Sequence, residues 1–299
     1  MKLLLLGKDG QVGWELGRAL SPLGELVACG RREVDLTDLG ALRQHVRHVR
    51  PDVVVNAAAY TAVDRAESEP DMAYRVNAEA VRVLAEEAAR LGALLVHYST
   101  DYVFSGNQDS AYVEDDETAP LSVYGASKLQ GELNIRQAAA RHLIFRTSWV
   151  YAARGTNFAK TILRLARERE ELRIVADQHG APTSAEFIAD ATALALHGLM
   201  NDRMSQWFGT YHLSASGSTS WFEYAVHLLT LAQARGMRLK VEPQEVRAIS
   251  TSEYPVAAKR PAYAVLNCDK LARVFGLQLP DWRYHLSRFV DEISGNEGQ

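Results

Sequence analysis

The glycine-rich segment near the start of the chain is the feature that most constrains its fold. Gly7, Gly10 and Gly13 have the spacing G-x-x-G-x-x-G, between the apolar run Leu3–Leu6 and a helical pattern from about Gln11 to Leu20. Glycine permits a tight strand-to-helix turn and lets backbone N–H groups approach a pyrophosphate at the helix N-terminus. Such turns also occur without a ligand, but the flanking strand and helix favour a dinucleotide site.

Apolar runs and helical patterns alternate through the first half of the chain. Further strands are predicted at Leu26–Cys29, Asp52–Asn56, Leu94–Ser99 and Leu143–Thr147. Helices are predicted at Leu39–Val49, with Thr37 as N-cap, at Pro70–Leu91 and at Ser127–Ala140. This alternation requires crossover connections, and the nearly continuous apolar strands suit a sheet covered on both faces. We predict an α/β fold with a Rossmann-type doubly wound parallel sheet.

The second half of the chain is less regular. Helices are predicted at Phe158–Arg169, Glu186–Leu199, Trp221–Ala234 and Tyr284–Ile293, and strands at Leu172–Val175, Tyr211–Leu213 and Leu239–Glu242. Because no low-complexity linker is present, any second domain is expected to pack against the first. We predict an NAD(P)-binding domain over residues 1–150 and a smaller, mainly substrate-binding domain over residues 151–299.

Composition excludes several classes of partner. The net charge of −4 and the lack of a basic cluster argue against a nucleic acid polymer. The run Leu3–Leu6 is too short for a signal peptide or a membrane span. The two cysteines, Cys29 and Cys268, lie far apart, and the nine histidines are scattered, which disfavours a catalytic metal. We expect a cytoplasmic protein that binds no membrane.

Tyr124 and Lys128 form a Y-x-x-x-K pair, which places both side chains on one helix face. A lysine ammonium near the phenol is expected to lower the pKa of tyrosine toward neutrality, so that the phenol can donate a proton to a reduced carbonyl oxygen. The pair follows the fourth predicted strand, which ends with Ser99 and Thr100, and ligands of parallel sheets bind beyond such strand ends. His97, within this strand, is predicted to be a core histidine.

The end of the second predicted strand addresses the adenosine ribose in dinucleotide-binding folds. An acidic residue there favours NAD, whereas this chain has Cys29-Gly30-Arg31-Arg32. Arginine can pair with a 2′-phosphate, so Arg31 favours NADPH over NADH. Asp35 and Leu36 follow at a position suited to the adenine.

Blocks of sequence across most of the chain resemble one family. They are GKDGQVGWEL, RPDVVVNAAAYTAVDRAESEP, VHYSTDYVFSG, PLSVYGASKLQGE, FRTSWVYAARGTNFAKT, DQHGAPT and KRPAYAVLN. The chain resembles the dTDP-4-dehydrorhamnose reductase family of extended short-chain dehydrogenases/reductases. The resemblance implies reduction of the C4 ketone of dTDP-6-deoxy-L-lyxo-4-hexulose to dTDP-L-rhamnose by NADPH, or by NADH in some members. This is the last step in making activated rhamnose for cell-surface polysaccharide.

The resemblance also implies roles for individual residues. Cofactor contacts are implied for Gly10, Gln11 and Val12 at the phosphates, Asp35 and Leu36 at the adenine, Ala59, Tyr60 and Thr61 after the third strand, and Tyr98 and Lys128 near the nicotinamide ribose. Sugar contacts are implied for Thr100, Asp101 and Trp149, with Tyr124 as proton donor, Lys128 as its partner and Arg260 as a candidate for the nucleotide diphosphate. Tyr60 departs from the family, where histidine is often found. In this superfamily segments of the second half also return to the first domain.

Some members of the family bind Mg²⁺ between two subunits through acidic side chains. Glu15, Glu186 and Glu292 match or lie near such positions. The resemblance therefore implies a homodimer, with a structural ion that takes no part in the chemistry.

Two alternatives remain from the sequence. One is another sugar-nucleotide enzyme of the same fold, an epimerase or a dehydratase, although Thr100-Asp101-Tyr102 lacks the glutamate that dehydratases place after the aspartate. The other is a non-catalytic NADP-binding regulatory subunit of methionine adenosyltransferase, since a branch of the family serves that role. The presence of Tyr124, Lys128 and Thr100 favours an enzyme.

Overall fold

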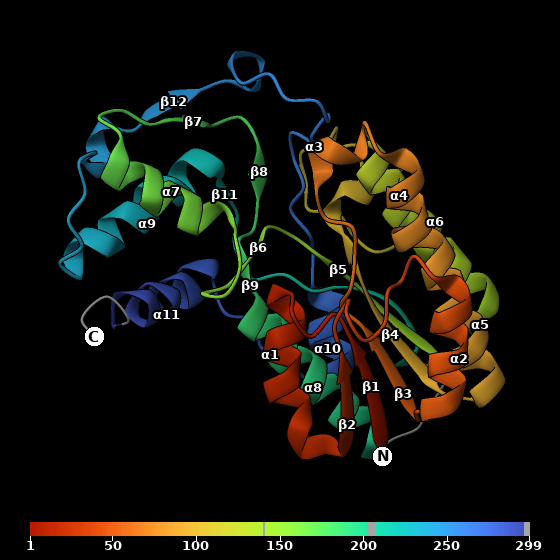
Figure 1. Ribbon diagram of the computed structural model, residues 1–299. Coiled ribbons are helices and arrows are strands. Elements are labelled where there is room, and N and C mark those ends of the chain that lie inside the picture. Colours follow the sequence, from red (N-terminus) through yellow and green to blue (C-terminus); the bar gives the residue numbers. More distant parts are fainter. Residues whose placement is uncertain (140, 202–206, 296–299) are drawn as a thin grey trace.

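The computed structural model describes residues 1–139, 141–201 and 207–295. Within them, six parallel strands form the main sheet, in the order β2-β1-β3-β4-β5-β10 (Figure 1). The strands are β1 (Lys2–Leu6), β2 (Glu25–Cys29), β3 (Val53–Asn56), β4 (Leu94–Thr100), β5 (His142–Thr147) and β10 (Gly209–His212). The order reverses between β1 and β3, which is where doubly wound sheets bind ligands. The predicted fold is thus confirmed.

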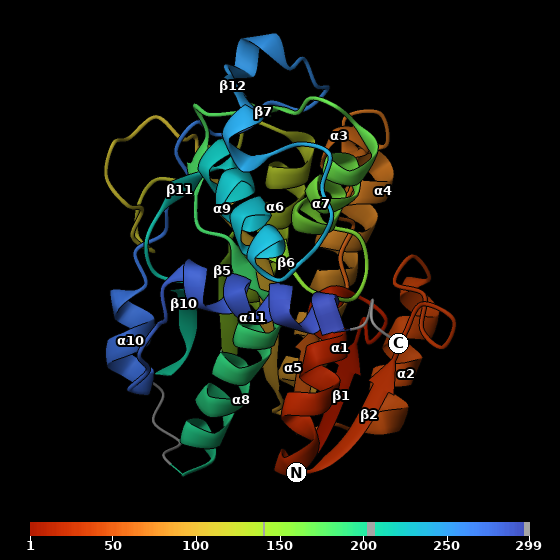
Figure 2. The ribbon, with the colours of Figure 1, turned by 90° about the vertical axis from the view of Figure 1, so that its left-hand side faces the viewer.

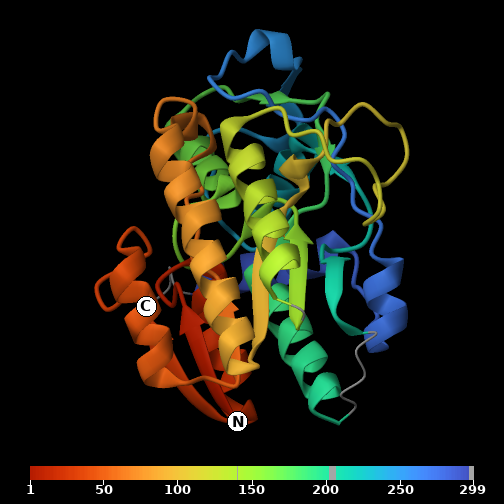
Figure 3. The same ribbon diagram turned by 90° about the vertical axis from the view of Figure 1, so that its right-hand side faces the viewer.

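Apolar residues on both faces of the strands explain why helices cover the sheet twice. In β1, Leu3 and Leu5 pack into one core and Leu4 and Leu6 into the other, as the two-residue period of a strand requires. The first face is covered by α1 (Gln11–Leu20), α8 (Ala185–Asn201) and α10 (Asp269–Phe275). The second is covered by α2 (Leu39–Val49), α5 (Ala80–Leu91) and α6 (Val123–Ala138), which lie at the front of Figure 3.

A third hydrophobic core lies beside the main sheet. It is built around α7 (Phe158–Glu168), α9 (Trp221–Ala234) and α11 (Trp282–Gly295). Three small sheets join them: β6 (Val150–Tyr151) with β9 (Thr183–Ser184), β7 (Arg173–Val175) with β12 (Arg247–Ile249), and β8 (His179–Gly180) with β11 (Thr219–Ser220). The separate cores support the proposed division near residue 150, while β10 and α8 return from the second half to the main sheet.

Three local predictions were wrong. The N-cap of α2 is Asp38, whose carboxylate accepts from the N–H of Ala41, because the Thr37 hydroxyl instead donates to Asp35. No strand forms over residues 239–242, where the buried Val241 crosses the end of α7 with only isolated backbone bonds. The helix predicted over residues 70–91 is α4 (Pro70–Tyr74) and α5 joined by a π-helical turn, Arg75–Glu79.

The remaining elements are short. They are α3 (Val63–Ala66) and the 3-10 turns Ser21–Leu23, Asp101–Val103, Pro243–Glu245 and Thr251–Glu253. None of the helices in the described ranges is long and apolar enough to cross a membrane.

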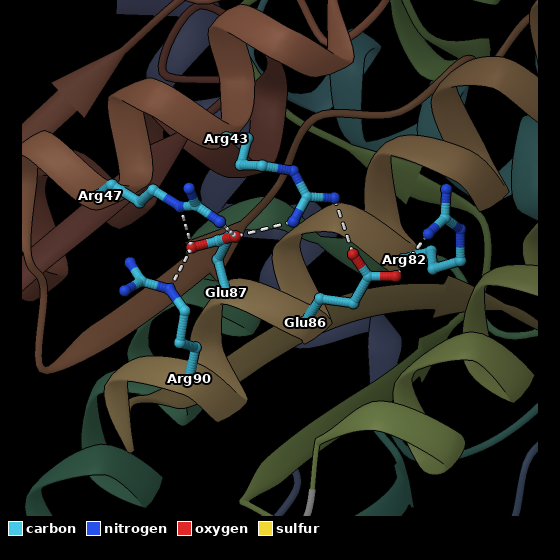
Figure 4. A network of polar contacts seen from close by, with 6 residues as sticks. All are labelled: Arg43, Arg47, Arg82, Glu86, Glu87 and Arg90. Carbon is cyan, nitrogen blue, oxygen red and sulfur yellow. Dashed lines mark hydrogen bonds and ion pairs between the residues drawn. The ribbon is translucent and has the colours of Figure 1, made fainter.

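An ion-pair network joins α2 to α5 on the second face of the sheet (Figure 4). The Glu87 carboxylate is buried and accepts from Arg43, Arg47 and Arg90, each at 2.8 Å. These positive charges, Arg47 above all, lower the pKa of Glu87 to about 2. The network ties together two helices that cover neighbouring strands.

Candidate active site

The glycine loop turns sharply from β1 into α1. Gly7 has a φ of +87°, in the region that favours glycine, and its carbonyl accepts from the N–H of Gly10 at 3.0 Å. A Cβ on Gly13 would lie 1.9 Å from the oxygen of Gly7, so only glycine lets the helix pack this close. Gly10 is the N-cap of α1 and gives no side-chain cap. The first N–H groups of the helix therefore face the loop and can bind an anion.

A cavity of about 900 Å³ runs from this loop along the carboxyl ends of the strands. The predicted site residues that line it are Gly7, Gly10, Gln11, Val12, Arg31, Asp35, Leu36, Ala59, Tyr60, Thr61, Tyr98, Thr100, Asp101, Tyr124, Lys128 and Trp149. Gly13 lies beneath the loop, and Arg260 and the three glutamates lie outside the cavity. Residues far apart in the sequence thus meet on one surface, with an extent suited to a dinucleotide and a sugar.

Tyr124 and Lys128 lie on successive turns of α6, which begins four residues earlier than predicted. Ser122 caps the helix by accepting from the N–H of Gly125 at 3.2 Å. Burial raises the pKa of Tyr124 to about 12, and the Thr100 hydroxyl offsets part of this shift. The prediction that Lys128 lowers this pKa was wrong, because its amino group is directed instead to the carbonyl of Tyr98, at 2.5 Å. Tyr124 is a neutral phenol at pH 7, which is the form that donates a proton.

Lys128 is buried beside an internal ion pair. Burial lowers its pKa to about 8, and the negative charge of Glu132 opposes the shift. The Glu132 carboxylate receives a bidentate pair of hydrogen bonds from the buried Arg146, at 3.0 and 2.8 Å, and a further bond from Ser99. These contacts fix β4, β5 and α6 relative to one another at the site.

Asp101 lies directly after β4 and is buried. Its two carboxylate oxygens accept from Thr100 at 2.9 Å and from Ser148 at 2.7 Å. Burial raises its pKa to about 6 despite these bonds. The Thr100 hydroxyl also accepts from the N–H of Tyr102 at 3.2 Å. This end of the cavity therefore presents hydroxyl groups and one carboxylate to a polar ligand.

Trp149, which also lines the cavity, has an unusual backbone conformation. Its φ of +45° lies in the left-handed region, which non-glycine residues rarely adopt. A Cβ on Gly180 would lie 2.6 Å from the indole, so that glycine makes room for the ring. Trp221, at the start of α9, also lines the cavity and was not predicted. Nothing in the sequence near Trp221 indicates that α9 begins at the cavity.

The π-helical turn places a second residue that sequence reasoning missed. Asn77, fully buried in that turn, accepts from the N–H of Tyr60 at 2.9 Å and donates to its carbonyl at 3.0 Å. It also donates to the Ser127 hydroxyl at 3.0 Å. Asn77 thereby ties the strand-end segment of Tyr60 to α6. Interrupted helices of this kind often occur at functional sites, but the sequence predicted one continuous helix here and so gave no such signal.

Arg31 and Asp35, which follow β2, line an exposed part of the cavity. The Arg31 guanidinium is 80% exposed and pairs with Asp35 at 3.4 Å, so it is free to turn toward a phosphate. Asp35 accepts from the N–H and the hydroxyl of Thr37, and these bonds lower its pKa. Tyr98 contributes to the cavity wall, but its hydroxyl bonds with Thr192 of α8 at 2.9 Å.

Arg260 lines a second cavity of about 630 Å³, between α7, α9 and the small sheet of β7 and β12. This cavity shares Phe158 and Trp221 with the first. The Arg260 guanidinium donates to Asp64 at 2.8 Å and also interacts with Tyr102, which lines the first cavity. Arg260 therefore lies between the two cavities.

The three predicted metal ligands lie on α1, α8 and α11, which meet on one side of the molecule (Figure 2). Burial and the negative charges of Glu15 and Glu186 raise the pKa of Glu292. Glu15 pairs with Arg18 and Glu186 with Arg288. Among the described residues, no three acidic, histidine or cysteine side chains are placed to hold a metal ion within one chain.

Comparison with known proteins places the chain among sugar-nucleotide reductases. The family model described as the RmlD substrate binding domain matches residues 1–294. The chain is 49% identical over 301 residues to the dTDP-4-dehydrorhamnose reductase of Escherichia coli K12, covering 98% of each protein. It is 50% identical over 295 residues to the enzyme of that name from Burkholderia thailandensis, covering 98% of this chain and 99% of the relative.

A solved structure supports the same assignment. The crystal structure of dTDP-4-dehydrorhamnose reductase from Bacillus anthracis, in complex with NADP, matches with a TM-score of 0.86 and 38% identity. The match covers 97% of this chain and 99% of that one.

Proposed function

The chain belongs to the dTDP-4-dehydrorhamnose reductase family, and from this premise we propose how its residues reduce the C4 ketone of dTDP-4-dehydro-L-rhamnose to dTDP-L-rhamnose. The observation that carries the proposal is the arrangement of one cavity. It begins at the glycine loop and ends at Thr100, Tyr124 and Lys128. A dinucleotide and a keto sugar can therefore meet at the tyrosine.

NADPH is the proposed cofactor, with NADH as a second donor. The uncapped start of α1 suits the pyrophosphate, and Gln11 and Val12 would hold it. Arg31 would pair with the 2′-phosphate, and Asp35 and Leu36 would contact the adenine. When bound, the nicotinamide supplies a hydride to C4 of the sugar.

Tyr124 supplies the proton that this reduction needs. Its phenol is protonated at neutral pH and donates to the C4 oxygen, while the Thr100 hydroxyl holds the same oxygen. The C4–O double bond thus gains one hydride on carbon and one proton on oxygen. Lys128, when charged, has three N–H donors, which would bind the Tyr98 carbonyl and the two nicotinamide ribose hydroxyls.

The two cavities divide the substrate between them. The sugar would lie against Trp149 and Asp101 in the first cavity, and the thymidine in the second. Arg260, between the cavities, is suited to the diphosphate that joins these parts. The apolar wall of the second cavity, which includes Phe158 and Trp221, favours a planar base.

We also propose a homodimer through α1, α8 and α11. Three large apolar side chains on these helices are more than half exposed: Trp14, Leu194 and Tyr284. Exposed apolar groups of this size gather at interfaces between subunits. Since one chain holds no metal centre among its described residues, a structural Mg²⁺ would need carboxylates from both subunits. Sedimentation with and without a chelator tests both proposals.

A coupled assay tests the reaction. The purified chain is mixed with NADPH and dTDP-4-dehydro-L-rhamnose, and both NADPH oxidation and dTDP-L-rhamnose formation are followed. We expect product in equal amount to the NADPH consumed. A chain that forms no product but co-purifies with a methionine adenosyltransferase would instead support the regulatory-subunit alternative.

We also propose that the reductase works in the cytoplasm, which agrees with the two buried free thiols, Cys29 and Cys268.

A further inference from the structure

Beneath Lys128, two neighbouring strands bring together a buried asparagine and a buried histidine. Asn56 ends β3 and stands beside His97 of β4 in the parallel register. Both side chains are almost completely buried. Neither takes part in the proposed proton or hydride transfer, and a buried imidazole needs defined hydrogen-bond partners.

The backbone fixes which way the Asn56 amide points. Its Oδ1 accepts from the N–H of Ala58 at 3.2 Å, so its Nδ2 is the atom 3.1 Å from Nδ1 of His97. An amide NH₂ group can only donate, and Nδ1 must therefore be an acceptor without a proton. Burial and the charge of Lys128 lower the pKa of His97 well below its ordinary value, so the ring is neutral. A neutral ring that accepts at Nδ1 carries its proton on Nε2.

That Nε2 atom faces Lys128, whose Nζ lies 3.4 Å away. A lysine ammonium offers only N–H groups and would meet the Nε2–H donor to donor, whereas the neutral amine has a lone pair to accept it. We infer that Asn56 and His97 are positioning residues that fix the imidazole proton on Nε2 and thereby favour the neutral amine of Lys128. The amine retains a donor for the carbonyl of Tyr98.

The other ionisable groups around Lys128 do not reverse this preference. On α6, Tyr124 lies one turn before and is neutral, and Glu132 lies one turn after. Glu132 favours the ammonium, but its charge is shared with Arg146 from β5 and with Arg136. Asp101, after β4, directs its carboxylate to hydroxyl groups. Burial lowers the pKa of Lys128 to about 8 although the charge of Glu132 opposes this shift.

This pair sets the alkaline limit of the reaction, a consequence that rests on the proposed function. Reduction needs the charged Lys128, because the ammonium has three N–H donors for the Tyr98 carbonyl and the two ribose hydroxyls, whereas the neutral amine has two. As the lysine loses its proton with rising pH, kcat falls. Because Asn56 and His97 favour the neutral amine, they move the fall of kcat to lower pH.

Asn56→Asp tests the inference with one atom changed. The carboxylate still accepts from Ala58, but it also accepts from Nδ1–H, so the His97 proton moves to Nδ1 and Nε2 becomes an acceptor for the ammonium. Long-range ¹H–¹⁵N spectra of the imidazoles, assigned by comparison with His97→Leu, should show Nε2–H in the parent and Nδ1–H in the variant. The alkaline fall of kcat should move up by about one pH unit.

His97→Leu removes the Nε2–H donor, which a glutamine amide would restore, and should move the alkaline fall of kcat upward even if Asn56→Asp does not fold. His212→Leu is the matched control, because His212 is another buried histidine, and it contacts Asn267 and Arg146. In this control variant, the alkaline fall of kcat should stay at the same pH as in the parent. The inference would be overturned if His97 of the parent protein carried its proton on Nδ1. It would also be overturned if the alkaline fall of kcat stayed at the same pH after the tautomer had switched. The spectra need no substrate, so they stand even if the proposed reaction fails.

Discussion

The indole ring of Trp149 stacks face to face on that of Trp221, with centroids 3.4 Å apart and planes inclined by 8°. One ring comes from the segment after β5 and the other from the first residue of α9. Phe158, the first residue of α7, packs on Trp221 with centroids 4.4 Å apart. This aromatic stack joins the core beside the main sheet to the wall of the proposed sugar site.

Trp221→Ala should weaken sugar-nucleotide binding without changing cofactor binding. Loss of the stack frees Trp149, and an aromatic pair contributes about 1 kcal/mol beyond its buried area. We expect the KM for the dTDP-sugar to rise about tenfold, with the KM for NADPH within twofold of the parent. Steady-state kinetics with each substrate varied in turn measure this difference. Equal increases in both KM values would contradict the placement of the sugar.

Gly13→Ala should disrupt the glycine loop. The new Cβ would meet the Gly7 carbonyl at 1.9 Å, and the neighbour is backbone that cannot turn away. We expect NADPH affinity to fall at least about tenfold and thermal stability to drop. Gly17→Ala, one turn later in α1, is the control, since its Cβ meets nothing within 4 Å. It should stabilise the chain by about 0.5–1 kcal/mol. Similar effects at both positions would refute this account of the loop.

Arg31→Ala should change cofactor preference. If Arg31 pairs with the 2′-phosphate, its loss removes about 1.5 kcal/mol or more from NADPH binding alone. The ratio of kcat/KM for NADPH to that for NADH should then fall about tenfold. The neighbouring Arg32→Ala, at a position equally exposed, serves as the comparison. An unchanged ratio in Arg31→Ala would show that this guanidinium does not grip the phosphate.

Glu87→Gln should lower the free energy of unfolding at neutral pH by about 2 kcal/mol, because three arginines lose a buried anion. The folded pKa is near 2, below the ordinary 4.5, so the contribution of Glu87 is present above pH 4.5 and is lost as pH falls toward 2. Urea unfolding at several pH values should therefore show the two proteins converge in acid. Glu168→Gln, an exposed helix pair with Arg164, should cost less than about 0.5 kcal/mol.

A difference in unfolding free energy between the parent and Glu87→Gln that stayed constant from neutral pH to pH 2 would contradict the assigned ion network.

The ion network also shows that the sequence alone does not predict how α2 and α5 pack. Arg43, Arg47 and Glu87 look like solvated helix residues in the sequence, and only the docking of α2 on α5 brings them together.

The main sheet could be predicted because its signals are local. The continuous apolar run Leu3–Leu6 and the glycine turn after it depend on residues close in the sequence. Helix geometry alone likewise predicts that Tyr124 and Lys128, four residues apart, lie on one face of a helix.

Other parts of the site depend on contacts between distant segments. Trp221 reaches the cavity because α9 packs on α7, and Asn77, in the π-helical turn, holds the backbone of Tyr60, which lines the cavity. The pKa of Tyr124 was mispredicted for the same reason. The spacing shows that Lys128 lies on the same helix face as Tyr124. It does not show that the amino group of Lys128 donates to the carbonyl of Tyr98.

Tyr124→Phe tests the central claim most directly. The ring and its packing remain, and only the proton donor is removed. Tyr102→Phe is the matched control, since its ring packs edge-on against Tyr124 at 5.8 Å and it too is a tyrosine of the cavity wall. We expect Tyr124→Phe to bind NADPH as the parent does and to lose at least about 100-fold in kcat, with Tyr102→Phe within a few fold. A Tyr124→Phe enzyme that reduces dTDP-4-dehydro-L-rhamnose within a few fold of the parent rate would contradict the account.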